Sequence, residues 1–136
     1  MNKGILLCVD DDAIVLLALK DQLRRAFGGA HLIEAAESAA EALEILDELV
    51  GDGYLPLLII SDWLMPGMKG DEFLIEAHQR FPNVIKVMLS GQADPEAIAR
   101  VRSQANLYEF IAKPWNADAL IASIHAGLAS FVRPAA

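Results

Sequence analysis

The distance between successive apolar runs is the feature that most restricts how this chain can fold. Five runs of β-forming residues follow one another at intervals of about 23 to 29 residues, which leaves room for one helix between each pair of strands. These runs end near Val9, Ala36, Ile60, Leu89 and Ala112. Residues 5–9, 57–60 and 84–89 lack the alternation of half-exposed strands, so we expect helices on both faces of the sheet. The pattern predicts a doubly wound α/β domain with a five-stranded parallel sheet and five helices.

Helical periodicity and capping residues fill the intervals between the runs. Asp12 precedes the first helix, Ser38 and Glu41 form a possible capping box, and the pair Asp94-Pro95 and Asn116 precede two later helices. Pro82 closes the third helix. Apolar residues at helical spacing predict the buried faces. They are Leu16, Leu19, Leu23 and Phe27; Leu43, Leu46 and Val50; Ile98, Val101 and Ala105; and Leu120, Ile124, Leu128 and Phe131.

Length and composition exclude several classes of protein. With 136 residues, 54% of them hydrophobic, we expect one domain over residues 1–136, with an ordered core over about 5–132 and a tail or linker start at 133–136. The net charge of −8 argues against direct binding of nucleic acid. No run approaches the roughly 20 apolar residues of a membrane-spanning helix. The single Cys8 lies in an apolar run, where a buried hydrophobe is expected, and a cytoplasmic protein fits this pattern.

Charged and polar residues follow four of the five predicted strands. Asp10 and Asp11 follow the first strand, Asp62 the third, Ser90 the fourth and Lys113 the fifth. Ligands of open parallel sheets bind at the carboxyl ends of the strands, so these side chains would converge if the strand order is 2-1-3-4-5. Taken singly, each aspartate has a simpler interpretation as a turn or cap residue, and we assign Asp12 that role. Together they predict a Mg²⁺-assisted phosphate site in which a carboxylate can act as a nucleophile.

Read together, these residues resemble the receiver domain of two-component response regulators. The resemblance covers almost the whole chain, from Ile5 to about Val132, and it depends on four segments in the same order and spacing. These segments are residues 9–12 (VDDD), 61–70 (SDWLMPGMKG), 88–91 (MLSG) and 110–115 (FIAKPW). The resemblance implies a flavodoxin-like fold with strand order 2-1-3-4-5. Lys69 departs from the acidic or small polar residue that is frequent at its position in the family.

The resemblance also implies a role for each site residue. Asp62 matches the phosphoacceptor, which receives a phosphoryl group from a histidine kinase or a histidine phosphotransfer protein. Asp11 and Asp62 match direct Mg²⁺ ligands, Asp10 a ligand through water, and Leu64 a backbone-carbonyl ligand. Ser90 and Lys113 match the hydroxyl and the lysine that contact the phosphoryl group. Phe110 matches an aromatic switch residue, and the bond between Lys113 and Pro114 is expected to be cis.

The output of such a domain is expected at the face formed by the fourth helix, the fifth strand and the fifth helix. This face could contact an effector domain or a second copy of the chain. Candidates near it are Ile98, Val101, Arg102, Tyr108 and Ala119. A simpler interpretation of Phe110 is a fixed core aromatic.

Two other functions compete with this interpretation. A small haloacid-dehalogenase-like phosphatase would use Asp10 as its nucleophile, because the first strand ends in an Asp-x-Asp motif. That family needs a later acidic pair, whereas Asp118 stands alone after Lys113, and the phosphatase leaves Asp62 unexplained. A binding module that works without phosphorylation is disfavoured because every chemical position is filled. We therefore expect a signalling domain that catalyses only its own phosphorylation and slow dephosphorylation, and not an enzyme.

Overall fold

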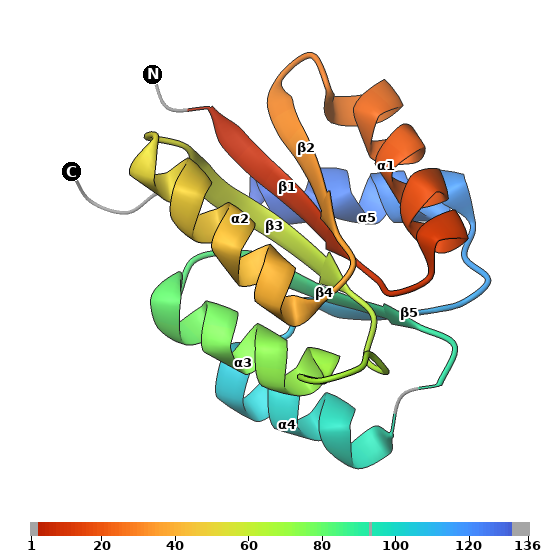
Figure 1. Ribbon diagram of the computed structural model, residues 1–136. Helices are drawn as coiled ribbons and strands as arrows, with labels where there is room; N and C mark the ends of the chain where they lie inside the picture. Colours follow the sequence, from red (N-terminus) through yellow and green to blue (C-terminus); the bar gives the residue numbers. More distant parts are fainter. Residues whose placement is uncertain (1–2, 93, 132–136) are drawn as a thin grey trace.

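The computed structural model describes residues 3–92 and 94–131, and its elements alternate between strand and helix along the chain (Figure 1). The predicted tail at 133–136 lies outside the described residues. The strands are β1 (Gly4–Val9), β2 (His31–Ala36), β3 (Leu55–Ser61), β4 (Ile85–Ser90) and β5 (Glu109–Ala112). The helices are α1 (Ala13–Phe27), α2 (Ala39–Gly51), α3 (Gly70–Arg80), α4 (Pro95–Ala105) and α5 (Ala117–Ala129).

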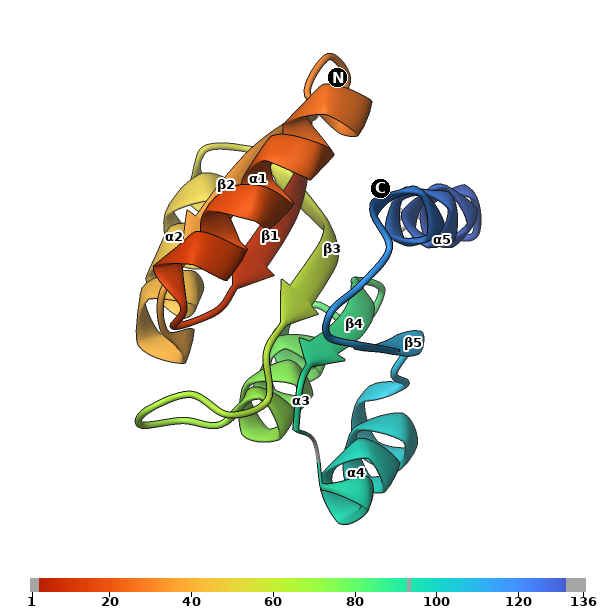
Figure 2. The ribbon, with the colours of Figure 1, turned by 90° about the vertical axis from the view of Figure 1, so that its right-hand side faces the viewer.

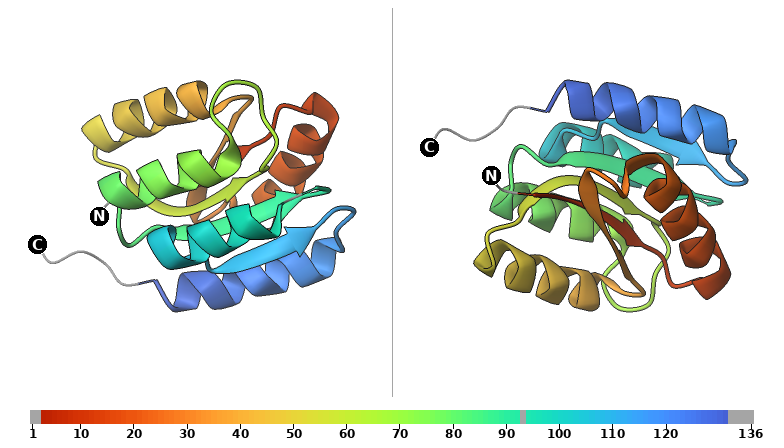
Figure 3. Two further views of the ribbon diagram at one scale, coloured as in Figure 1. Left: turned by 90° about the horizontal axis from the view of Figure 1, so that it is seen from below. Right: turned by 90° about the horizontal axis from the view of Figure 1, so that it is seen from above.

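The strands form one parallel sheet in the order β2-β1-β3-β4-β5, as predicted. Helices α1 and α5 cover one face of the sheet, and α2, α3 and α4 cover the other (Figures 2 and 3). The order of the strands reverses between β1 and β3, so the residues that follow these two strands lie side by side. Within the described residues, no helix combines the length and the hydropathy needed to cross a membrane.

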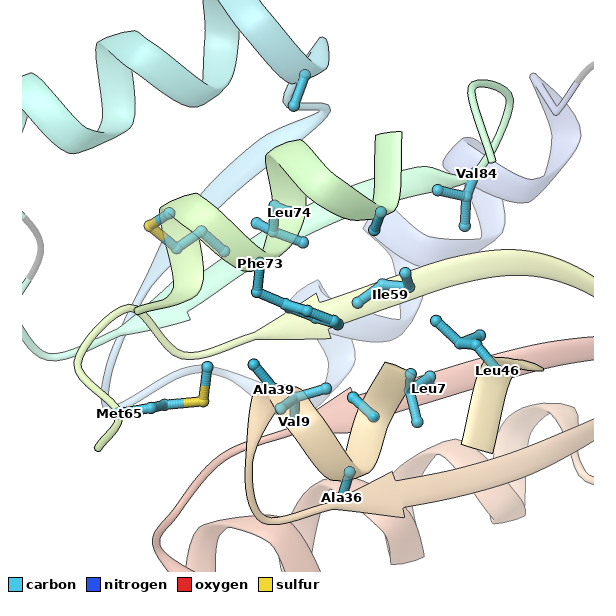
Figure 4. Packing of buried hydrophobic residues seen from close by; sticks show 14 of the residues in the cluster. Leu7, Val9, Ala36, Ala39, Leu46, Ile59, Met65, Phe73, Leu74 and Val84 are labelled. Carbon is cyan, nitrogen blue, oxygen red and sulfur yellow. The ribbon is translucent and has the colours of Figure 1, made fainter. Parts of the chain in front are cut away.

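Two apolar layers hold the helices on the sheet. Cys8 lies buried on the α1 and α5 side, as the sequence predicts, and burial raises the pKa of its thiol to about 12. On the other side, Phe73 of α3 packs close to Ile59 of β3, and Leu46 of α2 packs toward β1 (Figure 4). A fully buried side chain of this size stabilises the fold by roughly 1.5–3 kcal/mol.

The predicted caps form where the sequence places them. The side chains of Asp12, Ser38, Asp94 and Asn116 each accept a backbone N–H from the first turn of their helix. Such a cap contributes about 1 kcal/mol to helix stability. The caps fix where α1, α2, α4 and α5 begin, and the loops before α1 and α5 carry site residues.

Three details differ from the predicted pattern. Strands β3 and β4 each end one residue later than predicted, at Ser61 and Ser90. Val50, predicted on the buried face of α2, is exposed, because the helix turns Ala39, Ala42 and Leu46 toward the sheet instead. Val101, a candidate for the output surface, is fully buried on the inward face of α4, so it belongs to the core.

Candidate functional site

Backbone hydrogen bonds between strands bring the predicted site residues to one edge of the sheet. The Asp62 N–H donates to the Val9 carbonyl at 2.9 Å, which places the end of β3 beside the end of β1. The Lys113 N–H donates to the Ser90 carbonyl at 3.1 Å and joins β5 to β4 in the same way. The peptide bond between Lys113 and Pro114 is cis, as the resemblance implies. Side chains from four strands therefore meet at one edge.

Three carboxylates form the centre of this edge. Oxygen atoms of Asp10, Asp11 and Asp62 lie within 4.8 Å of one another. Asp10 and Asp62 are buried, whereas Asp11 is exposed. Uncompensated carboxylates at this distance repel one another, so the edge is suited to a cation. The three oxygen donors, one of them on the exposed Asp11, fit a hard divalent ion that keeps some of its water ligands.

Lys113 supplies a positive charge next to two of the carboxylates. Its Nζ donates to Asp10 Oδ2 at 2.7 Å and lies 3.4 Å from Asp62 Oδ2. Burial alone would lower the pKa of Lys113, but the hydrogen bond with Asp10 and the charges of Asp62 and Asp10 outweigh it and raise the pKa. The ammonium group is therefore fully charged at neutral pH. Burial raises the pKa of the Asp10 carboxyl, and the hydrogen bond from Lys113 opposes this rise only in part.

Both oxygen atoms of Asp10 have partners. Oδ1 accepts the Asp12 N–H at 2.8 Å, and Oδ2 accepts Lys113 Nζ. Asp62 differs, because its Oδ1 accepts the Trp63 N–H at 2.8 Å whereas, among the described residues, its Oδ2 has only the longer contact with Lys113. Of these two buried aspartates, Asp62 has the oxygen that is more available for a reaction.

The remaining predicted residues differ in their surroundings. Ser90 is buried, and its Oγ accepts the Gln92 N–H at 3.3 Å. Leu64, in the loop after β3, has an exposed side chain. Phe110 is half-buried and packs against the apolar layer on the α2, α3 and α4 side. Asp118, the acidic residue available to the phosphatase hypothesis, is exposed in the first turn of α5.

Two polar contacts near the site were not predicted from the sequence. Trp63 Nε1 donates to Asp71 Oδ1 at 3.2 Å, and Arg100 Nη1 donates to Asp71 Oδ2 at 2.5 Å. The only sequence signal was an acidic residue in the first turn of the third helix, which is common at helix N-termini. Arg100 is 29 residues from Asp71, and Trp63 lies eight residues before it across an irregular loop, so the pattern alone did not identify either partner.

Comparisons with known proteins agree with this geometry. The family model for the response regulator receiver domain matches residues 6–125. The hydrogenase transcriptional regulatory protein HoxA of Cupriavidus necator is 33% identical over 123 residues, which are 90% of this chain and 24% of HoxA. The sensor kinase CckA of Brucella abortus is 29% identical over 120 residues, 88% of this chain and 12% of CckA. This chain thus spans a quarter or less of these relatives.

A solved structure shares the fold over nearly the full length of both chains. A CheY-like response regulator receiver domain protein from Methanospirillum hungatei superposes with a TM-score of 0.80 and 29% identity, and 95% of each chain is covered. The strand order, the three clustered aspartates and the family match all favour the receiver interpretation over the phosphatase. This chain belongs to the family of response regulator receiver domains.

Proposed function

We propose that Asp62 is the residue that accepts the phosphoryl group, and that the surrounding site assists the transfer with Mg²⁺. The observation that carries this proposal is the position of Lys113 Nζ between Asp10 and Asp62, beside three carboxylates whose oxygens lie within 4.8 Å. One ammonium and a divalent cation together balance the three carboxylate charges, so an incoming phosphoryl group would meet two cations and not an uncompensated acidic cluster. Asp11 and Asp62 would bind the ion directly, Asp10 through water and Leu64 through its carbonyl.

The transfer that we propose is a substitution at phosphorus. An Asp62 carboxylate oxygen forms the new bond to phosphorus while the bond from phosphorus to the imidazole nitrogen of the donor breaks, and that nitrogen keeps the electron pair. When bound by the three aspartates, Mg²⁺ would supply positive charge for the phosphoryl oxygens. Lys113 pairs with one phosphoryl oxygen, and the Ser90 hydroxyl donates a hydrogen bond to another. The product is an aspartyl phosphate.

The donor that we propose is a histidine kinase or a histidine phosphotransfer protein. Helix α1 begins beside the acidic centre and carries two apolar side chains in open solvent, Ile14 at 82% and Leu17 at 71% exposed. Large apolar side chains at such exposure are typical of a surface that a partner covers. A donor protein on this face would bring its phosphohistidine close to Asp62.

The test of this proposal is a labelling experiment. The protein, Mg²⁺ and either acetyl phosphate or a phosphorylated histidine kinase are mixed, and intact-mass and peptide mass spectrometry follow the product. We expect one acid-stable, base-labile phosphoryl group per chain, on Asp62. Continuous hydrolysis of a phosphate monoester, or a phosphoryl group on Asp10, would contradict the proposal and support the phosphatase.

We further propose that phosphorylation is read out at a face formed by α4, β5 and α5, where an effector domain or a second copy of the chain would bind. Ile98 and Arg102 line a shallow depression on α4, and Tyr108 is partly exposed with its hydroxyl donating to the Ser123 carbonyl at 3.2 Å. A phosphoryl oxygen would draw the Ser90 hydroxyl toward it, and Phe110 would then turn into the space behind β4.

Ser90→Ala tests this readout. The variant should still be phosphorylated on Asp62, but phosphorylation should no longer change its affinity for a partner or its dimerisation. Moving a population from 1:99 to 99:1 takes about 5.5 kcal/mol, so we expect wild-type activation to be partial. Sedimentation with and without phosphodonor measures the effect. Full phosphorylation-dependent association in Ser90→Ala would exclude the route through Ser90 and Phe110.

A further inference from the structure

Both ends of the loop between β3 and α3 contact Asp62 or the residue next to it. At its start, the Trp63 N–H donates to Asp62 Oδ1 at 2.8 Å. At its end, the Gly70 N–H donates to the Trp63 carbonyl at 2.7 Å, and a Cβ on Gly70 would lie 2.0 Å from the Asp62 carbonyl oxygen. Only glycine permits this approach. The first turn of α3 therefore presses directly against the backbone of Asp62 and Trp63.

The side chain of Trp63 also has contacts with the residues at the start of α3. Its indole N–H donates to Asp71 Oδ1 at 3.2 Å, and Lys69 Nζ lies 5.2 Å from the ring centroid. An ammonium group over an indole face is attracted by the ring quadrupole. The indole thus has a carboxylate at its edge and a cation over its face, and both come from the start of α3 and the residue before it.

Asp71 connects this loop to α4. The residue is only 3% exposed, and its second oxygen accepts Arg100 Nη1 at 2.5 Å. Helices α3 and α4 lie side by side (Figures 1 and 3), and the contact between Asp71 and Arg100 joins the first turn of α3 to α4. A buried carboxylate that loses its cationic partner is costly to keep charged. Arg100 therefore determines whether Asp71 can stay in place as the acceptor for Trp63.

We propose that Asp71 and Arg100 are positioning residues for the phosphoacceptor, an inference that rests on the proposed function of Asp62. Arg100 donates a hydrogen bond to Asp71, and Asp71 accepts the indole N–H of Trp63. The backbone N–H of Trp63 in turn donates to Asp62 Oδ1. This chain of contacts fixes the orientation of the carboxylate and of the loop that carries Leu64. Coupling of this kind is reciprocal, so a change at Asp62 also biases the position of α4. The route is separate from the one through Ser90 and Phe110.

The experiment uses Trp63 as its own reporter. In a Trp115→Phe background, Trp63 is the remaining tryptophan, so its emission reports on the indole and on Mg²⁺ binding beside it. We compare Arg100→Gln, Arg100→Lys and Asp71→Asn, each checked for folding by circular dichroism. Arg80→Gln is the matched control. Arg80 also makes an ion pair, with 3.1 Å between its Nη1 and Asp47 Oδ1, but it is the last residue of α3 and so lies at the other end of the helix from this loop.

Arg100→Gln should shift the Trp63 emission and slow phosphorylation by acetyl phosphate by roughly tenfold, the scale of losing an outer partner of a metal ligand. Arg100→Lys should recover at least half of the rate, and Arg80→Gln should change neither property. Asp71→Asn keeps an acceptor for the indole but loses the charge, so adding Arg100→Gln to it should have little further effect.

Two results would overturn the inference. Phosphorylation of Arg100→Gln within twofold of the background protein, with shifted emission, would mean that the contacts are only structural. Additive effects of Asp71→Asn and Arg100→Gln would mean that the two residues act separately. Failure of the proposed function gives a different result, because the background protein itself would then incorporate no phosphoryl group.

Discussion

Lys113 and Lys86 both lie inside the fold but at opposite ends of the sheet, and their amino groups have different surroundings. Lys113 follows the carboxyl end of β5, and its Nζ contacts Asp10 and Asp62. Lys86 is near the start of β4 and only 1% exposed, and its Nζ contacts the Val84 carbonyl at 2.7 Å and His78 Nδ1 at 3.0 Å. Among the described residues, none of the ion pairs involves Lys86.

The pKa values of the two lysines shift in opposite directions for this reason. Burial lowers the pKa of Lys86 to about 8, whereas the carboxylates beside Lys113 outweigh burial and raise its pKa. Burial and the Lys86 ammonium also lower the pKa of His78. Burial alone therefore removes charge from a lysine at moderately alkaline pH, and a functional cation needs carboxylates close to it. The carboxylates beside Lys113 keep its ammonium group charged, as the proposed contact with a phosphoryl oxygen requires.

The largest effect is expected from removing the nucleophile of the acidic centre. Asp62→Asn should abolish labelling by acetyl phosphate, since an amide is a poor nucleophile toward phosphorus. The variant should also reduce the upward pKa shift of Lys113, because the charge of Asp62 contributes to it. Asp11→Asn should abolish the Mg²⁺ dependence of labelling. Mass spectrometry measures the labelling of both variants. Undiminished labelling of Asp62→Asn would refute the assignment of Asp62 as the phosphoacceptor.

The two lysines should differ strongly when each is replaced by methionine. Lys113→Met should slow phosphorylation roughly 100-fold, the typical cost of losing a group that stabilises developing charge. Lys86→Met removes an ammonium that is more deeply buried than that of Lys113 but lies at the other end of the sheet, so its labelling rate should stay within about twofold of wild type. Initial phosphorylation rates of the two variants at saturating Mg²⁺ measure this difference. Equal losses in the two variants would show that burial of a lysine, and not its carboxylate partners, is what labelling requires.

Replacing Lys86 should instead change the free energy of unfolding, and the lowered pKa of Lys86 fixes how this change depends on pH. Lys86 has a pKa of about 8 in the folded protein and 10.5 when unperturbed, so the unfolded chain binds more protons between these values. Wild-type stability should therefore gain a contribution as pH rises from about 8 to 10.5. At pH 7 the free energy of unfolding of Lys86→Met should exceed that of wild type by roughly 1–2 kcal/mol, and this difference should shrink toward pH 10.

Urea unfolding at both pH values measures this difference. Lys3→Met, at an exposed position, is the control and should follow wild type. Groups whose pKa does not depend on Lys86 cancel in the comparison, and His78 is the exception because the Lys86 ammonium contributes to its lowered pKa. An advantage of Lys86→Met that grows with pH would contradict the lowered pKa.

The two ends of the sheet also differ in how well the sequence predicted them. The aspartates and Lys113 could be predicted because each directly follows a strand, and parallel strands bring their ends to one edge. Lys86 could not, because it lies within a run, residues 84–89, that reads as apolar. Asp71 and Arg100 were missed for a related reason: an acidic residue in a first turn and a basic residue on a helix are ordinary on a solvated face. Only the packing of α3 against α4 brings them together.

The smallest effect concerns the access of water to the three carboxylates. Lys86, at the other end of the sheet, is only 1% exposed to water. Leu64 is 46% exposed in the loop after Asp62, where a side chain can border the approach of water to an aspartyl phosphate. An apolar side chain cannot orient that water, so we expect slow loss of the phosphoryl group in wild type. Leu64→Asn or Leu64→Glu should shorten its lifetime roughly fivefold, well below the roughly 100-fold of a fully aligned general base. Leu64→Ile, which stays apolar, should keep the wild-type lifetime. Phosphoryl loss is followed by mass spectrometry after removal of the donor, and equal or longer lifetimes in both polar variants would show that Leu64 does not control this water.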